Sequence, residues 1–374
     1  MPQSFDIKSQ RIGIGNPKGA NNVVKVANQL VGDSHPCFII AEAGSNHNGS
    51  LKKALGLIDI AVRAKADAVK FQTFRAEKLY LKTAGQSRYL KINKSIYDII
   101  KEMEMPVQWI PKLAAYCQKK RIIFLSTPTD EECVDWLEPY VPAYKIASYE
   151  MTAIPLVEYM AKKKKPMFVS TGTANLEEVR QTIQAIKNAG NDQIILMQCT
   201  ASYPAPLTAI NVRSILTMKR EFEIPVGLSD HSREFDVAPM AAVAIGANCI
   251  EKHFTFSNDL PGPDHRFALE PNELKLMVQR IRSVEETLGS GRKETLELEK
   301  ELRQFARRSI FTIRKVQKGE QFTPDNIATL RCGTQKGKLH PAEYKKVLHK
   351  TATRNLKAYQ AVKLGDYAVK AWEL

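Results

Sequence analysis

The sequence predicts an α/β fold, a (β/α)8 TIM barrel followed by a small β-rich domain. Eight short apolar segments alternate with helical patterns between residues 37 and 288, and about 250 residues is the usual length of such a barrel. These segments are continuously apolar, which is typical of parallel strands covered on both faces. An open doubly wound sheet is the alternative, but no GxGxxG motif follows the first segment.

The alternation of segments defines the elements that we expect in the barrel. Helical spacing of apolar residues predicts helices over Leu51–Ala64, Leu176–Asn188, Phe235–Ile245 and Pro271–Leu288. The gap from Thr73 to Val107 is too long for an ordinary loop, so we expect an insertion that carries binding residues. The predicted strands are Cys37–Ala41, Ala68–Gln72, Ile122–Ser126, Ala143–Ala147, Pro166–Ser170, Gln193–Gln198, Ile224–Ser229 and Ala247–His253.

The segments that flank the barrel have other patterns. Residues 1–34 are expected to form an extension that ends in a short hairpin and caps the barrel floor, and the barrel itself covers residues 35–290. Residues 291–305 are charged and helical in pattern, as in a linker. Residues 306–374 contain short strand-like segments with turn signals, which predicts a separate β-rich domain.

The composition is that of a globular protein, with 374 residues of which 44% are hydrophobic and 25% are charged. No run of about 18 apolar residues is present, so we expect no membrane span. The polar N-terminus lacks the apolar stretch of a signal peptide. The six cysteines are scattered without a CxxC pair, which indicates reduced thiols and a cytoplasmic protein.

The net charge of +15 is concentrated near the C-terminus, where the segment from Ala306 to the end holds 15 Lys or Arg and 5 Asp or Glu. Such a basic domain is compatible with nucleic-acid binding. It lacks interleaved aromatic residues, zinc-ligand spacing and a helix-turn-helix pattern, and a positive cover over a small anionic substrate explains it equally well. We therefore expect no nucleic-acid partner.

Two of the seven histidines come at the ends of predicted strands. His231 follows Ile224–Ser229, and His253 ends Ala247–His253. The C-terminal ends of barrel strands meet at one face, where TIM-barrel enzymes carry their active sites. Converging imidazoles near carboxylates form sites for Mn, Zn or Fe, so the pair predicts a metal centre. Two hydrogen-bonded structural histidines are the alternative.

The other strand ends are also polar, whereas a purely structural barrel would carry apolar residues there. Lys70 and Lys145 suit phosphate or carboxylate binding as point charges, and hydroxyls and backbone amides add geometry. Lysines paired with Glu42, Glu150 or Glu251 are the structural alternative, and a Schiff-base lysine is a second catalytic one. The further strand-end residues are Glu42, Gln72, Ser126, Thr127, Ser148, Glu150, Ser170, Thr171, Gln198, Thr200, Tyr203 and Glu251.

Four polar residues near these strand ends are interpreted one by one. Glu42 lies on the first strand, beside the place where the eighth must close the barrel, and is expected to act as a general acid or base or to orient a neighbour. Asp230 and His47 are expected to have local structural roles. Asp264, in the rigid loop Pro261–His265, could reach a sugar hydroxyl, although turn formation also explains that loop.

Together these motifs resemble the sialic acid synthase family, whose members condense phosphoenolpyruvate with an N-acylhexosamine. The resemblance implies a C-terminal SAF (antifreeze-like, β-clip) domain, matched by Arg308–Phe311, Lys318–Glu320 and Leu330–Gly333, and a domain-swapped homodimer. The matching stretches in the barrel are Ile40–Gly49, Asp67–Thr73, Ser126–Pro128, Tyr144–Ser148, Ser170–Gly172, Cys199–Thr200, Tyr203–Pro206, Gly227–Ser232, Glu251–Phe254 and Pro261–His265.

The resemblance also implies a role for each matched residue. His231 and His253 would bind a divalent metal, Mn²⁺ first, with Mg²⁺ or Co²⁺ as substitutes. Glu42, Lys70, Lys145 and Glu150 would be catalytic, with Glu150 positioning water or substrate. The two lysines together with Gln72, Thr127, Ser148 and Ser170 would hold phosphoenolpyruvate. Glu42, Tyr203 and Asp264, together with Arg331 of the partner subunit, would face the sugar.

The reaction that the resemblance implies joins N-acetylmannosamine, phosphoenolpyruvate and water to give N-acetylneuraminate and phosphate by C–O cleavage. Two departures leave the sugar open. Family members often carry Asn where this chain has Ala201, and the usual Arg-Pro-Gly is Arg331-Cys332-Gly333 here. A legionaminic or pseudaminic acid synthase that uses a diacetamido-deoxyhexose is one alternative. A non-catalytic barrel that binds carbohydrate or nucleic acid is the alternative of another class.

Overall fold

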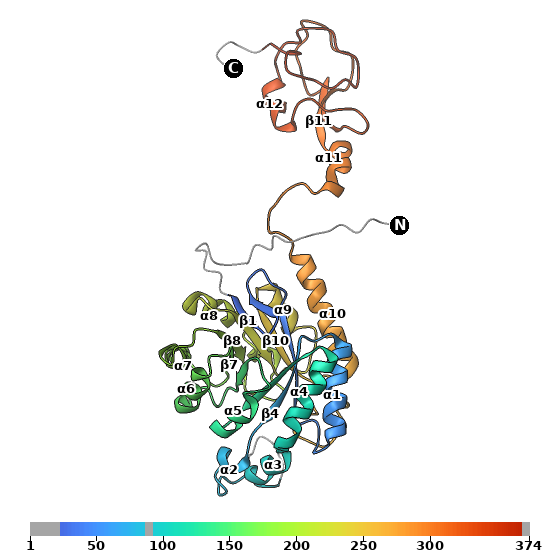
Figure 1. Cartoon of the computed structure of the whole chain (residues 1–374). Coiled ribbons are helices and arrows are strands. Elements are labelled where there is room, and N and C mark those ends of the chain that lie inside the picture. The colour runs from blue at the N-terminus through green and yellow to red at the C-terminus, as the bar shows by residue number, and fades with distance from the viewer. Residues whose placement is uncertain (1–22, 87–92, 369–374) are drawn as a thin grey trace. The chain divides into compact units, whose positions relative to one another are not determined.

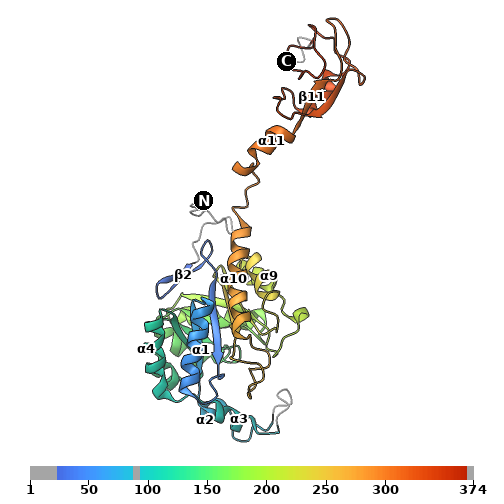
Figure 2. The ribbon, with the colours of Figure 1, turned by 90° about the vertical axis from the view of Figure 1, so that its right-hand side faces the viewer.

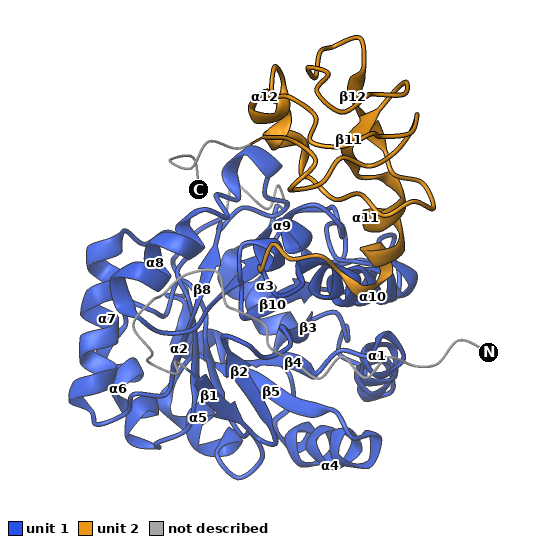
Figure 3. Cartoon of the chain, turned by 90° about the horizontal axis from the view of Figure 1, so that it is seen from above, with its two compact units in different colours: residues 1–291 blue, residues 292–374 orange. Residues whose placement is uncertain are grey.

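The structure, a computed structural model, describes residues 23–86 and 93–368. The chain divides into two compact units, unit 1 with residues 1–291 and unit 2 with residues 292–374 (Figure 3). The first 22 residues of the expected N-terminal extension, and residues 369–374 of the expected β-rich domain, lie outside the described residues.

Unit 1 is a parallel eight-stranded barrel surrounded by helices (Figure 1). The strand order is β5-β4-β3-β10-β9-β8-β7-β6, and β5 and β6 at its two ends lie next to each other. The predicted TIM barrel is therefore confirmed, and the open doubly wound sheet was the wrong alternative. The strands are β3 (Phe38–Gly44), β4 (Ala68–Thr73), β5 (Ile123–Pro128), β6 (Tyr144–Ile146), β7 (Met167–Ser170), β8 (Ile194–Cys199), β9 (Val226–Asp230) and β10 (Cys249–His253).

The helices cover the outside of the barrel, and the predicted bounds of three of them agree with the structure. Ser50 begins α1 by accepting a hydrogen bond from Lys53 N, and Asn175 with Glu178 forms a capping box on α7. The helices of unit 1 are α1 (Leu51–Ala64), α2 (Ala76–Leu79), α3 (Ile96–Met103), α4 (Ile110–Lys120), α5 (Glu131–Leu137), α6 (Ile154–Lys162), α7 (Leu176–Asn188), α8 (Ser214–Phe222), α9 (Ala238–Ala244) and α10 (Pro271–Leu288).

A hairpin of β1 (Val23–Val26) and β2 (Gln29–Gly32) closes the N-terminal end of the barrel. Its residues Val24, Val26 and Val31 are buried against the inward side chains of the barrel strands, and each such valine contributes about 1.5–3 kcal/mol by leaving water. The hairpin lies at the end of unit 1 opposite α2 and α3, which belong to the insertion after β4 (Figure 2).

The inward-facing residues change from apolar to polar along each strand. Alternate residues of a strand face the same side, and in β3 these are Phe38, Ile40 and then Glu42, while in β4 they are Ala68 and then Lys70. The lower part of the interior is consequently an apolar core, in which the rings of Phe38 and Phe168 stack at 5.8 Å. The charged groups gather at the C-terminal end of the strands.

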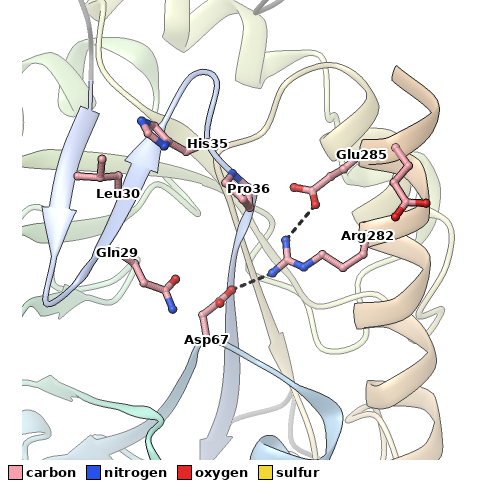
Figure 4. Close-up of a pocket in the computed structure, with 8 residues that line it drawn as sticks. Gln29, Leu30, His35, Pro36, Asp67, Arg282 and Glu285 are labelled. Atoms are coloured by element: carbon pink, nitrogen blue, oxygen red, sulfur yellow. Dashed lines mark hydrogen bonds and ion pairs between the residues drawn. The ribbon is translucent and has the colours of Figure 1, made fainter. Parts of the chain in front are cut away.

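The N-terminal end of unit 1 carries a cavity of about 600 Å³ beside the hairpin (Figure 4). Arg282 of α10 pairs there with Asp67 at 3.0 Å and Glu285 at 3.1 Å, and it also donates to the Cys37 carbonyl. Glu285 accepts from Cys37 N, and Asp67 accepts from Ile39 N. This network joins α10 to the start of β3, so it has a structural role.

Unit 2 has its own small core and is β-rich. Its strands β11 (Arg308–Thr312) and β12 (Ile327–Arg331) are antiparallel, and the buried residues Ile310, Phe322 and Ile327 belong to one cluster. The unit also contains α11 (Lys300–Ala306) and α12 (Tyr344–Val347). Among all described residues, no helix is long and apolar enough to cross a bilayer.

Candidate active site

Three neighbouring strands bring Glu42, Lys70 and His253 together at the C-terminal end of the barrel. In the strand register, Glu42 of β3 lies beside Lys70 of β4 on one side and His253 of β10 on the other. The Lys70 Nζ atom is 2.6 Å from Glu42 Oε2 and donates to Thr127 Oγ1 at 3.0 Å. Gln72 donates to Glu42 Oε1 at 2.9 Å. Four of the predicted site residues and one of the predicted metal ligands thus form one cluster.

Glu251 of β10 is the centre of the charged cluster, although the sequence suggested it only as a possible lysine partner. Its Oε1 atom lies 3.1 Å from Lys145 Nζ and 3.5 Å from Lys70 Nζ. Burial would raise the pKa of Glu251, but the two lysines outweigh it and lower that pKa to about 2. Glu251 therefore stays ionised and pairs with both lysines inside the barrel.

Glu42 differs from Glu251 because burial dominates its ionisation. Burial raises the pKa of Glu42, and Lys70 only partly opposes this shift. A carboxyl with a raised pKa holds a proton more readily near neutral pH, which suits a general acid. The structure therefore places the two carboxyls in different electrostatic states within one cluster.

Hydroxyl groups from β6 and β7 line the side of the cluster near Lys145. The backbone N–H of Gly172 donates to Ser148 Oγ at 3.0 Å. A Cβ atom at Gly172 would lie only 2.7 Å from that oxygen, so glycine permits the approach. Among the described residues, the buried Ser170 Oγ and Glu251 Oε2 have no hydrogen-bond partner. Buried polar atoms without partners are unusual in proteins and are available to a ligand here.

His231 and His253 converge, with ring centroids 5.4 Å apart. The Nδ1 of His231 lies 2.9 Å from the Thr200 carbonyl and donates to it, so Nε2 is the nitrogen of this ring that would bind a ligand. The Nδ1 of His253 lies 3.5 Å from Asp264 Oδ2. Burial would lower the pKa of His253, but Asp264 outweighs it and raises that pKa. The His231 ring is therefore oriented by a hydrogen bond from its Nδ1, as in protein metal sites, whereas His253 Nδ1 contacts Asp264 without a hydrogen bond.

The donor set fits a divalent ion that is held by few protein atoms. The described residues contain no cluster of three or more His, Cys, Asp or Glu arranged to hold a metal ion. Two imidazoles would leave several coordination positions for water and a substrate oxygen, and catalytic metal sites require such open positions.

Behind the histidines, a buried ion pair fixes the turn that carries His231. Lys252 donates to Asp230 Oδ2 at 2.6 Å and to the Glu234 carbonyl at 3.0 Å. Asp230 also accepts a hydrogen bond from Ser232 N, which agrees with the local structural role predicted for it. The ion pair between Asp230 and Lys252 was not predicted. His47, expected to be structural, is buried and accepts from Gly49 N.

Tyr203 and Asp264 lie beside the histidines, as the sequence suggested. The Tyr203 ring is 4.2 Å from that of His231. Gly44 has φ +51°, and a Cβ atom there would lie 2.9 Å from Asp264 Oδ2, so a glycine makes room for this carboxylate. Glu150 is half-buried after β6, and burial raises its pKa. Arg331 belongs to unit 2, where it is exposed at the end of β12.

The sequence of this chain matches the profile of the NeuB family over residues 57–293. The chain belongs to the NeuB family. It is 46% identical to the spore coat polysaccharide biosynthesis protein SpsE of Bacillus subtilis, over 85% of this chain and 89% of that protein. It is 40% identical to the N,N'-diacetyllegionaminic acid synthase of Legionella pneumophila, over 87% of this chain and 93% of that protein.

A solved structure supports the same relationship. The N-acetylneuraminic acid synthetase of Leptospira borgpetersenii, crystallised with citrate, aligns with a TM-score of 0.69 and 35% identity, over 75% of this chain and 95% of that one. The predicted resemblance to the sialic acid synthases is therefore confirmed at the level of the family, whose named members make sialic and legionaminic acids.

Proposed function

We propose that the chain condenses phosphoenolpyruvate with an open-chain N-acylhexosamine, N-acetylmannosamine first, and releases phosphate by C–O cleavage to give N-acetylneuraminate. The observation that carries the proposal is the division of one buried centre into a lysine half, with Lys70 and Lys145, and a histidine half, with His231 and His253. A reaction between an anionic enol phosphate and an aldehyde needs both halves.

In the proposed complex, the lysine half holds phosphoenolpyruvate. The two lysines neutralise its carboxylate and phosphate, and Gln72, Thr127, Ser148 and Ser170 add directed hydrogen bonds. Support comes from the contacts of the lysines with Glu42 and Glu251, since a substrate anion can replace a side-chain carboxylate as their partner. The free hydroxyl of Ser170 gives further support.

In the histidine half, His231 and His253 would hold a divalent ion, Mn²⁺ first, with Mg²⁺ or Co²⁺ as substitutes, which would polarise the sugar aldehyde as a Lewis acid. The Thr200 carbonyl and Asp264 keep the two rings in the required orientation. Asp264 and Tyr203 face the sugar in this arrangement.

The chemistry then assigns a task to each carboxyl. A carbon–carbon bond forms between the methylene carbon of phosphoenolpyruvate and the aldehyde carbon, and Glu42 gives its proton to the new hydroxyl oxygen. Water oriented by Glu150 adds to the former enol carbon, and one of its protons returns to Glu42. The C–O bond to phosphate then breaks as the second proton passes to the departing phosphate, which leaves a keto group on that carbon. The raised pKa of both carboxyls supports these tasks.

We further propose that unit 2 is an SAF domain and that the chain acts as a domain-swapped homodimer. In this arrangement, Arg331 of the partner subunit contacts the acylamino group of the sugar. The exposure of the Arg331 side chain and its place at the end of β12 support an intermolecular role.

A second candidate sugar is the diacetamido-deoxyhexose of legionaminic acid synthesis. The observation that favours it is the identity to the legionaminic acid synthase of Legionella, which exceeds the identity to the sialic acid synthetase of Leptospira. A non-catalytic binding barrel is the candidate of another class, and the buried lysines and histidines argue against it because retaining them without a ligand is energetically costly.

Phosphate release from phosphoenolpyruvate tests the proposal, with a panel of N-acetylmannosamine, the diacetamido-deoxyhexoses of the legionaminic and pseudaminic branches, and unacylated mannosamine. Release with N-acetylmannosamine at the highest kcat/KM is the expected result. A higher kcat/KM with a diacetamido sugar would select the second candidate. No release with any sugar, together with salt-sensitive binding of RNA or DNA, would favour the non-catalytic barrel.

A further inference from the structure

Tyr149 is a large exposed aromatic residue at the rim of the buried centre. It follows Ser148 at the C-terminal end of β6, and its side chain is 58% exposed whereas Ser148 is buried. The proposed function gives this tyrosine no task. Exposed aromatic rings beside a polar centre offer an apolar face and a hydroxyl at low conformational cost, so Tyr149 is suited to contact a ligand at the entrance.

A short series of contacts links Tyr149 to the histidines. The side chains of Tyr149 and Tyr203 are hydrogen-bonded to each other. The Tyr203 ring in turn lies 4.2 Å from that of His231 and 5.4 Å from that of Phe267, which is itself 5.1 Å from His253. A change at Tyr149 is therefore transmitted through one hydrogen bond to the side of the site that faces the sugar.

The other hydroxyls of the Tyr203 loop already donate their protons within the loop. The hydroxyl of Thr200 donates to the Ala209 carbonyl at 2.8 Å, and that of Ser202 donates to the Pro204 carbonyl at 3.1 Å. Ala201 has no polar group. Tyr149, next to this loop, therefore offers its hydroxyl to a ligand. Where Tyr203 donates the hydrogen bond between the two tyrosines, the O–H proton of Tyr149 remains for an acceptor on the ligand.

We propose that Tyr149 is a specificity-determining residue for the sugar substrate, and this inference rests on the proposed function. The ring covers a C–H face or an acyl methyl group of the hexosamine, while the tyrosine pair donates one hydrogen bond to a sugar hydroxyl or acyl carbonyl. Phosphoenolpyruvate, held by the lysine half, makes no contact with Tyr149.

Two substitutions separate the contributions of the ring and the hydroxyl. Tyr149→Phe keeps the ring and removes the hydrogen bond to Tyr203, whereas Tyr149→Ala removes both. We expect the KM for the sugar to rise about threefold in the first variant and about tenfold in the second, which are the usual effects of one hydrogen bond and of one added aromatic contact. The KM for phosphoenolpyruvate should change by less than about twofold.

Tyr140 provides a matched control because it lies before β6, at the opposite end of the same strand, and is 39% exposed. Tyr140→Ala should leave both KM values unchanged. The experiment measures phosphate release with both substrates varied and repeats it over the panel of N-acylated sugars, with thermal unfolding of each variant.

The inference is supported if Tyr149→Ala raises the KM of the sugar alone and changes the ranking of the panel. It is overturned if both KM values rise equally, or if neither changes, while the wild-type chain releases phosphate. A wild-type chain that is inactive with every sugar would instead overturn the proposed function, and the inference with it.

Discussion

Both ends of the barrel contain buried charged groups, but the hydrogen-bond partners of their carboxylates differ. At the N-terminal end, Asp67 and Glu285 each accept a backbone N–H as well as a contact from Arg282 (Figure 4). At the C-terminal end, the carboxylates of Glu42 and Glu251 contact side chains, and Glu251 Oε2 has no hydrogen-bond partner among the described residues.

This difference separates a structural network from one whose lysines are suited to bind a substrate anion. A backbone N–H cannot leave its acceptor without disturbing the strand, whereas a lysine can exchange one anion for another. The cavity of about 600 Å³ lies at the N-terminal end, beside this structural network, so a cavity by itself does not mark the candidate site. Buried polar atoms that lack hydrogen-bond partners indicate the position of the candidate site more directly.

The largest expected effect comes from the histidines. His231→Ala and His253→Ala should each reduce phosphate release on the order of 10³-fold, as the loss of a principal electrostatic contact to the transition state does. Mn²⁺ binding, measured by calorimetry, should weaken in parallel while the thermal unfolding midpoint is retained.

His35→Ala is the control for both variants, because His35 lines the cavity at the N-terminal end. It should leave turnover and Mn²⁺ binding unchanged. Full activity of the metal-stripped His231→Ala/His253→Ala double variant would contradict the assignment of a metal to this pair.

Arg282→Ala should lower the free energy of unfolding without lowering the rate of phosphate release, which is the opposite of the result expected for the histidine variants. Removing one member of a buried charge pair costs about 3–5 kcal/mol, and we expect about 2 kcal/mol because the Arg282 side chain is 33% exposed and partly screened by solvent. Urea unfolding measures the change, and both KM values serve as the control. A fall in kcat with unchanged stability would show that this network takes part in catalysis.

The free energy of unfolding at acidic pH should depend on the ionisation of Glu251. Its folded-state pKa lies below the unfolded value, so its ionised form contributes stability that is present above about pH 4.5 and is lost as the pH falls toward 2. The difference in unfolding free energy between the wild type and Glu251→Gln should therefore shrink by about 3 kcal/mol over this range.

Asp67→Asn is the counterpart at the other end of the barrel. Burial raises the pKa of Asp67, so its ionised form opposes folding, and its contribution to stability falls as the pH rises through the folded-state pKa. The two variants should therefore give pH dependences of opposite sign. Parallel curves would mean that Glu251 is not held ionised by the lysines.

The sequence predicted much of this arrangement because it depends on local patterns. The eight strands follow from continuous apolar runs, and the positions of Lys70, His231 and His253 follow from the rule that strand ends share one face. The central place of Glu251 could not be predicted, since it depends on Lys70 and Lys145 meeting across the barrel from strands that are distant in the chain.

The sequence contained a signal for one contact that was not predicted, the ion pair between Lys252 and Asp230. Side chains alternate along a strand, so Lys252, between the inward-facing Glu251 and His253, must face the helices and needs a buried partner there, which is Asp230. The close approaches at Gly44 and Gly172 had no such signal, because they depend on the positions of Asp264 and Ser148 in other loops.

The smallest expected effect concerns Gly172. The Cβ of Gly172→Ala would lie 2.7 Å from Ser148 Oγ, so the hydroxyl must move, and we expect the KM for phosphoenolpyruvate to rise about tenfold, equivalent to about 1.4 kcal/mol. If the effect passes through Ser148, the double variant Gly172→Ala/Ser148→Ala should be no worse than Ser148→Ala alone, because interacting residues are not additive. Additive losses would instead mean that the Gly172 backbone meets the substrate directly, and the lysine half would then extend beyond the side chains assigned to it.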